Sequence, residues 1–252
     1  MKLSRRNFIR NSAAQAAGIA GIPLILSATL PAGKSKKAGK LVKQNGVVLF
    51  QGDSITDAGR NRTEQKPNHA GSFGGGYALM AAAGLLADYP EKNLTIYNRG
   101  ISGNKVYQLN DRWKEDCLDL KPDILSILIG VNDYWHKRNG NYDGTVDVYE
   151  RDYRALLNRT REALPGVKLV ICEPFSLDGG SAIGAGWQEE FGPYRKVAKA
   201  LSQEFDTLFI PYHTIFTEAL KHAPAAYWSP DGVHPSMAGA MLMADAWMDV
   251  VC

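Results

Sequence analysis

The chain has 252 residues, of which 45% are hydrophobic and 22% charged, a globular mixture that excludes a disordered, collagen-like or coiled-coil protein. Three cysteines are too few for a disulfide framework, and no CxxC or HxxxH pair indicates a zinc site. Residues 1–43 hold nine of the 29 basic residues and none of the 26 acidic ones, so residues 44–252 carry 20 basic against 26 acidic side chains, a net charge of −6 that does not indicate a nucleic-acid partner.

The first predicted element is an export signal over residues 1–32. Arg5 and Arg6 precede a weakly hydrophobic run rich in Ala and Gly, which is typical of a twin-arginine signal. A membrane anchor or an ordinary basic helix is the alternative, but Pro23 and the glycines disfavour a stable transmembrane helix. We therefore expect a periplasmic or extracellular protein without stable membrane insertion after signal removal, and a basic linker over residues 33–45.

The remaining chain, residues 46–252, alternates short apolar runs with amphipathic stretches, which predicts one α/β domain. Buried strands are expected over residues 46–51, 94–97, 123–129, 168–172 and 207–210. Helices are expected over residues 76–89, 106–118, 147–164, 191–205 and 236–251. Strands that alternate with helices form a parallel sheet covered on both faces. We therefore expect a three-layer α/β/α fold around a five-stranded parallel sheet, with 123–129 near its centre.

Polar residues collect where the predicted strands end. Such segments are residues 52–56, 98–104 and 130–133, and a fourth, 231–235, lies just before the last helix. Sites in an open parallel sheet form beyond the carboxyl ends of the strands. The four segments are therefore expected on one rim, although they are far apart in the sequence.

These segments, Gly-Asp-Ser-Ile-Thr, Asn-Arg-Gly-Ile-Ser-Gly-Asn, Gly-Val-Asn-Asp and Asp-Gly-Val-His-Pro, resemble the four sequence blocks of the SGNH, or GDSL-type, hydrolases. The resemblance extends over residues 46–240 and shows no departure at the four signature positions. It implies a flavodoxin-like α/β/α fold and ester hydrolysis with neither cofactor nor metal.

The same residues make chemical sense as a nucleophilic site. The Ser54 hydroxyl needs a base to remove its proton, and His234 is the candidate. Asp231 can bond the other imidazole nitrogen and hold the tautomer. The backbone N–H groups of Ser54 and Gly103 and the side-chain amide of Asn132 are the candidate oxyanion donors. The resemblance implies the same roles for these positions.

Each residue also has an ordinary structural interpretation. Ser54 could cap a helix, His234 could be a surface histidine, and Gly103 and Asn132 could form turns. The presence of the other three blocks favours Ser54 as a nucleophile, and for Gly103 and Asn132 only the shared rim favours the catalytic interpretation.

Two rival site chemistries have little support in the sequence. A cysteine nucleophile at Cys117 or Cys172 has no motif beside it, and Cys172 is expected in the core. A phosphate-binding loop would need a glycine pattern that the first strand–helix turn lacks.

Aromatic residues adjoin the candidate catalytic segments and suit the binding of sugar rings. They are Tyr134, Trp135, Tyr227 and Trp228, with Trp187 at the end of a glycine-rich loop, residues 179–186. Asp53 is expected to accept a hydrogen bond that stabilises its own loop. It is also counted among the candidate substrate-binding residues. A second glycine-rich loop, residues 59–75, is long and polar.

Export and the rim aromatics together predict a secreted serine esterase that removes acetyl or other short acyl groups from carbohydrate. The motifs also resemble those of bacterial carbohydrate esterases. The alternatives are a lipid or small-ester acylhydrolase, similar to lysophospholipases and thioesterases, and a non-catalytic carbohydrate-binding protein of the same fold. The substrate is a small molecule or an oligosaccharide ester, and the sequence predicts no particular oligomeric state.

Overall fold

The computed structural model describes residues 41–252. The predicted signal over residues 1–32 and most of the predicted linker lie outside the described residues. The end of that linker packs on the domain, because Val42 is buried in the core and the Asn45 N–H donates to the Lys92 carbonyl. The folded part therefore begins before residue 46.

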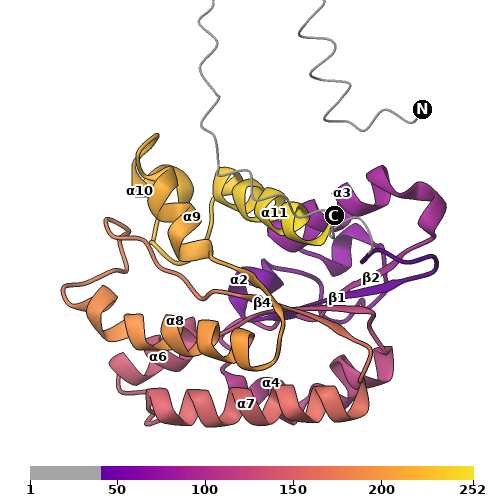
Figure 1. The fold of residues 1–252 in the computed structure, drawn as a ribbon. Helices are drawn as coiled ribbons and strands as arrows, with labels where there is room; N and C mark the ends of the chain where they lie inside the picture. Colours follow the sequence, from indigo (N-terminus) through magenta and orange to yellow (C-terminus); the bar gives the residue numbers. More distant parts are fainter. Residues whose placement is uncertain (1–40) are drawn as a thin grey trace, which may run out of the picture. The chain divides into compact units, whose positions relative to one another are not determined.

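Five parallel strands form the sheet, in the order β2-β1-β3-β4-β5 (Figure 1). They are β1 (Val47–Gly52), β2 (Thr95–Asn98), β3 (Ile124–Leu128), β4 (Lys168–Cys172) and β5 (Leu208–Ile210). Every residue of β3 is buried, and this strand pairs with β1 on one side and β4 on the other. The expected five-stranded parallel sheet with its most apolar strand at the centre is confirmed.

The strand order places a crevice beside β1. The chain passes from β1 outward to β2 and then returns to the other side of β1 to form β3. Where the order reverses in this way, the connections leave the sheet on opposite faces and open a crevice at the carboxyl ends of the strands. The segments after β1, β2 and β3 therefore meet at one edge of the sheet.

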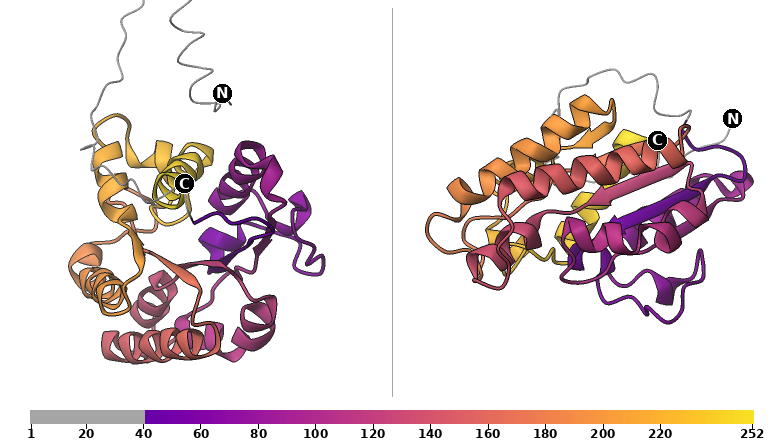
Figure 2. Two further views of the ribbon diagram at one scale, coloured as in Figure 1. Left: turned by 45° about the vertical axis from the view of Figure 1, so that its right-hand side comes forward. Right: turned by 90° about the horizontal axis from the view of Figure 1, so that it is seen from below.

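Helices cover both faces of the sheet (Figures 1 and 2). One face carries α3 (Tyr77–Asp88) packed beside α11 (Met237–Val251), with α9 (Tyr212–Ala219) and α10 (Ala225–Trp228) near them. The other carries α4 (Val106–Asp111), α6 (Val131–Arg138), α7 (Val146–Ala163) and α8 (Trp187–Glu204). A short helix, α2 (Ser54–Asp57), follows β1 directly. The three-layer α/β/α fold is confirmed.

The structure differs from two of the expected helices. The helix expected over residues 106–118 is broken into α4 and α5 (Trp113–Asp116). The helix expected from residue 191 begins at Trp187 and includes Pro193, so Trp187 is a buried residue of the first turn instead of a loop residue. Glu189 and Glu190 in that turn favour the positive end of the helix dipole and are a sequence signal for the earlier start.

Helices α6, α9 and α10 were not expected from the sequence. Helix α6 has few apolar residues, so its amphipathic period is weak. No helix among residues 41–252 is long and apolar enough to span a lipid bilayer.

Candidate active site

Ser54 lies at a sharp junction between β1 and α2. Gly52 has φ +157°, and a Cβ atom there would collide with the Leu128 carbonyl oxygen and the Thr56 hydroxyl, so only glycine fits. Asp53 caps α2 by accepting a hydrogen bond from the Ile55 N–H at 3.0 Å. The cap is therefore Asp53, and Ser54 is the first helical residue, which leaves its hydroxyl for another role.

The Ser54 hydroxyl, the His234 ring and the Asp231 carboxylate form a continuous chain of contacts. Ser54 Oγ lies 2.7 Å from His234 Nε2, and His234 Nδ1 lies 2.6 Å from Asp231 Oδ2. The second carboxylate oxygen of Asp231 accepts the N–H groups of Val233 at 2.8 Å and His234 at 2.7 Å. The three predicted catalytic residues are thus in contact in the order that proton transfer from the hydroxyl would need.

The surroundings of Asp231 favour its ionised form. Burial alone would raise its pKa, but the hydrogen bonds from the His234 ring and from the two backbone N–H groups outweigh burial and lower it. An ionised carboxylate can only accept, so His234 donates from Nδ1. The lone pair on Nε2 is then directed at the Ser54 hydroxyl.

Two further hydrogen bonds from neighbouring residues hold the loop that carries His234. The Ser229 hydroxyl donates to the His234 carbonyl at 2.9 Å, and the Leu177 N–H donates to the Gly232 carbonyl at 2.8 Å. Ser229 is fully buried. It was not singled out in the sequence, because no pattern distinguishes a serine that supports a loop from other serines.

Gly103 and Asn132, the remaining candidate oxyanion donors, come from neighbouring segments. Gly103 follows β2 with φ +82°, and nothing lies within 4 Å of the position its Cβ would take. Among the described residues, no acceptor is bonded to its N–H. Asn132, in the first turn of α6, uses one amide N–H on the Asn104 carbonyl at 3.3 Å, so its second amide hydrogen stays available. Asn104 follows Gly103 in the chain and accepts the Asn132 amide, so it connects the two candidate donors.

Two carboxyl groups beside these segments are almost completely buried. Burial raises the pKa of Asp53 and that of Asp133 to about 7, and the neighbouring Asp53 charge adds to the rise at Asp133. Asp133 accepts the Val106 N–H at 3.2 Å. Asp53 is 1% exposed. The prediction of a loop-stabilising acceptor is confirmed for Asp53, but a substrate contact for its side chain does not fit this burial.

The predicted substrate-binding aromatics separate into different environments. The half-buried Trp135 ring lies 6.3 Å from the His234 ring, between centroids. Tyr134 is instead a core residue, because its ring packs on Phe191 and Trp187 and its hydroxyl bonds to Glu190. Trp135 is thus the aromatic side chain of this set that lies next to the catalytic residues.

Tyr227 and Trp228 end α10, and their rings lie outside the cavity described next. The Trp228 indole donates to the Ala219 and Ala223 carbonyls at 3.0 and 3.2 Å. Tyr227 is 56% exposed and packs edge-on against Trp228. Neither ring lines the cavity at Ser54, so their predicted contact with substrate is not supported by this placement.

A cavity of about 250 Å³ opens beside the Ser54 hydroxyl. It is lined by small and apolar residues: Ser54, Ile55, Ala58, Gly75, Gly76, Tyr77, His234, Pro235 and Ala240. Gly75 and Gly76 were not expected in the site, since they belong to the long loop before α3. A larger hollow of about 650 Å³, between α6, the start of α7 and α8, has none of the candidate catalytic residues in its lining.

A cysteine nucleophile finds no support in the described part of the chain. Cys117 and Cys172 are buried, and burial raises the pKa of Cys172 to about 12, which keeps the thiol protonated. Cys172 is a core residue, as expected. No group of three or more His, Cys, Asp or Glu side chains among residues 41–252 is arranged to hold a metal ion.

Comparison with known proteins gives a consistent result. The sequence model of the GDSL-like lipase/acylhydrolase family matches residues 50–242. An acetylxylan esterase from Geobacillus stearothermophilus is 37% identical over 203 residues, which are 80% of this chain and 91% of that protein. A solved structure described as a GDSL-like lipase, from Parabacteroides merdae, is 53% identical with a TM-score of 0.82 and covers 83% of this chain and 97% of its own.

The crystal structure of the Geobacillus stearothermophilus acetylxylan esterase is also similar. It is 34% identical with a TM-score of 0.74, and covers 83% of this chain and 95% of its own. Structures of catalytic mutants of that enzyme, at a serine, an aspartate and a histidine, match equally well. The family match spans most of the chain and agrees with the fold and with the residues gathered at the sheet edge. The chain belongs to the GDSL-like lipase/acylhydrolase family and is a carboxylic ester hydrolase.

Proposed function

We propose that this protein is an exported serine esterase that removes acetyl groups from carbohydrate, with Ser54 as nucleophile, His234 as general base and Asp231 as its partner. The observation that carries the proposal is the continuous Ser54–His234–Asp231 hydrogen-bond chain beside a small apolar cavity. The similar acetylxylan esterase has catalytic mutants at the same three residue types, which supports the assignment.

The geometry suits a two-step acyl transfer. Ser54 Oγ attacks the ester carbonyl carbon while its proton passes to His234 Nε2, and the imidazolium is stabilised by the Asp231 carboxylate. The tetrahedral intermediate collapses when His234 returns the proton to the departing sugar oxygen. Water then attacks the acyl carbon while its proton passes to His234, and His234 returns that proton to Ser54 Oγ as the bond to the serine breaks and the carboxylic acid leaves.

Three N–H donors are proposed to stabilise the negative oxygen of the intermediate. The Ser54 N–H belongs to the first turn of α2, where backbone donors have no intrahelical acceptor. The Gly103 N–H has no bonded acceptor among the described residues, and Asn132 keeps one amide hydrogen available. Donors of this kind act on the charge that develops in the transition state, so they lower the barrier without tightening substrate binding.

The cavity favours a short acyl group. Its volume of about 250 Å³ lies below the roughly 300–1,000 Å³ of pockets that hold drug-sized ligands. Its apolar lining suits the methyl of an acetyl group better than a charged or long chain. The acetylxylan esterase relative and the Trp135 ring beside His234 support a sugar as the alcohol part of the ester.

Reaction class and substrate are tested separately. A fluorophosphonate probe should label wild-type protein at Ser54 and leave Ser54→Ala unlabelled. Acetylated xylo-oligosaccharides and p-nitrophenyl esters of two to twelve carbons should show a preference for acetyl. A preference for long chains would instead support the lipid acylhydrolase, and sugar binding retained by an unlabelled wild-type protein would support the carbohydrate-binding module.

Export is proposed from the sequence of residues 1–32. Cell fractionation of the full chain should place the protein outside the cytoplasm, and replacing Arg5 and Arg6 together by lysine should retain it inside. Equal export of both forms would contradict a twin-arginine signal.

A further inference from the structure

The loop that carries Gly103 is not held by packing at Gly103 itself. Nothing lies within 4 Å of its Cβ position, and its φ of +82° belongs to a region that a glycine leaves easily. A donor that stabilises an oxyanion must nevertheless point in one direction before the reaction starts. The direction of the Gly103 N–H must therefore be set by its neighbours, Ser102 and Asn104.

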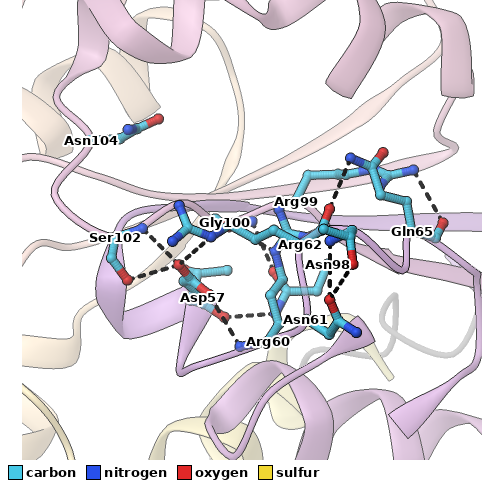
Figure 3. A network of polar contacts seen from close by, with 12 residues as sticks. Asp57, Arg60, Asn61, Arg62, Gln65, Asn98, Arg99, Gly100, Ser102 and Asn104 are labelled. Atoms are coloured by element: carbon cyan, nitrogen blue, oxygen red, sulfur yellow. Dashed lines mark hydrogen bonds and ion pairs between the residues drawn. The ribbon is translucent and has the colours of Figure 1, made fainter. Parts of the chain in front are cut away.

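Ser102 is held by the last residue of α2. Asp57 Oδ2 accepts both the backbone N–H of Ser102 at 2.8 Å and its hydroxyl at 2.7 Å (Figure 3). The Asp57 side chain is 3% exposed. Because Ser54 begins the four-residue helix that Asp57 ends, the same short helix carries the nucleophile and anchors the segment before Gly103.

Arg60 holds the same loop at Gly100, two residues before Ser102. Its guanidinium Nε donates to the Gly100 carbonyl at 2.8 Å, and its backbone N–H donates to Asp57 Oδ1 at 3.2 Å. Figure 3 shows Asp57 between Ser102 and Arg60, with the Arg62 side chain close by. Asp57 is therefore fixed on one oxygen by Arg60 while the other oxygen holds Ser102.

Asn104 is held from the opposite side by Arg112. The guanidinium Nε of Arg112 donates to Asn104 Oδ1 at 2.9 Å, while its Nη1 donates to Asp116 Oδ2 at 2.9 Å and to the Arg99 carbonyl at 2.8 Å. The Asn104 carbonyl accepts the Asn132 amide. Arg112 thus fixes the residue that joins the two candidate donors.

We propose that Asp57 and Arg112 are positioning residues, which hold Ser102 and Asn104 on either side of Gly103 and so aim the Gly103 N–H at the oxyanion. The inference rests on the proposed function and extends it to residues that touch no reacting atom. We call Asp57 and Arg112, with their hydrogen bonds to Ser102 and Asn104, the clamp. The clamp contributes to the catalytic rate by fixing the direction of the Gly103 N–H.

The test uses Asp57→Ala, Asp57→Asn and Arg112→Gln in the full chain, with p-nitrophenyl acetate as substrate. Complete loss of one oxyanion donor lowers kcat by about 100- to 1,000-fold, so misdirecting it should lower kcat by about 10- to 100-fold. KM should change by less than about threefold, since the donor acts on the transition state. Asp57→Asn keeps a carbonyl oxygen for Ser102 and should recover part of the loss.

Asp123→Ala is the matched control. Asp123 also accepts a backbone N–H, that of Val47 at 2.9 Å, but it lies at the opposite, amino-terminal end of the sheet. It should lower the melting temperature while leaving kcat per folded molecule unchanged. Equal kcat values for Asp57→Ala and Asp123→Ala, or a loss at Asp57 confined to KM, would overturn the clamp.

Hydrogen exchange separates this inference from the proposed function. Asp57→Ala should increase amide exchange in a peptide covering residues 101–105 and leave peptides from β3 and β4 unchanged. A wild-type protein that hydrolyses no ester would overturn the proposed function. Unchanged exchange of residues 101–105 in Asp57→Ala would overturn the clamp, whatever the activity.

Discussion

His234 Nε2 lies 2.7 Å from Ser54 Oγ across a sequence separation of 180 residues. Neither side chain can reach the other through local structure. The contact exists because β1 ends where the loop before α11 returns to the same edge of the sheet. The hydroxyl of one segment is thereby aligned with the imidazole and the carboxylate of another.

Removal of the base or the nucleophile should abolish nearly all turnover. For His234→Ala and Ser54→Ala we expect a fall in kcat on the order of 10⁴- to 10⁶-fold, with a smaller fall for Asp231→Asn, because an asparagine preserves the shape but not the charge. Steady-state kinetics with p-nitrophenyl acetate measures this. A loss of less than tenfold in His234→Ala would be incompatible with its role as base.

Asn132→Ala should act on kcat. It removes one proposed oxyanion donor, which typically contributes about 3 kcal/mol to barrier reduction, or roughly 100-fold in rate. Its effect on stability should be small, about 1 kcal/mol, since among the described residues its side chain makes a single hydrogen bond, of 3.3 Å, to the Asn104 carbonyl. Kinetics and urea unfolding of the same preparation check both; a change confined to KM would contradict the assignment.

The cavity beside Ser54 should set the preferred acyl length. Gly75 lines it, and nothing lies within 4 Å of its Cβ position. Gly75→Val should therefore fold normally and fill part of the cavity. We expect kcat/KM for p-nitrophenyl butyrate to fall at least tenfold more than that for the acetate.

Gly166→Val is the matched control, because Gly166 also has nothing within 4 Å and lies in the turn between α7 and β4. It should leave the acetate-to-butyrate ratio unchanged. An unaltered ratio in Gly75→Val would show that the acyl group binds elsewhere.

The buried Asp133 should make stability depend on pH near neutrality. Burial raises its pKa from 3.8 to about 7, so between these values the unfolded state is ionised while the folded state keeps its proton. Asp133 therefore lowers the stability of the folded state progressively as pH rises from about 4 to about 7. Asp133→Asn removes this effect and keeps an oxygen for the Val106 N–H.

Urea unfolding at pH 5 and pH 8 measures the difference. Relative to wild type, Asp133→Asn should gain stability between the two pH values, on the order of 1–3 kcal/mol. Parallel pH profiles for the two proteins would mean that the carboxyl is not protonated in the folded state.

Asp231 acts with the opposite sign. Its folded-state pKa lies below 3.8, so the stability it contributes is present above that value and is lost as pH falls through the folded pKa. Asp231→Asn should therefore lower stability by a constant amount above pH 5 and flatten the acid limb of the profile below it. A loss of stability that is the same at pH 3 and pH 7 would contradict an ionised Asp231.

The sequence by itself determined the strands and the segments that meet at the carboxyl edge of the sheet. A buried parallel strand reads as a continuous apolar run, so β3 could be located and placed at the sheet centre. The carboxyl ends of parallel strands lie at one edge of the sheet, and this rule alone predicted that the segments of Ser54, Gly103 and Asn132 lie close together. A motif that directly follows a predicted strand can therefore be placed at this edge from the neighbouring sequence alone.

Only the tertiary structure decided which side chains face the site. The period of an amphipathic helix does not distinguish a ring that packs on a neighbouring helix from one that faces a cavity, so Tyr134 and Trp135, adjacent in sequence, lie in different environments. The hydrogen bonds between Asp57 and Ser102 join the end of α2 to a loop 45 residues later in the chain. Such contacts depend on how the backbone folds in three dimensions, and the pattern of residue types along the chain does not predict them.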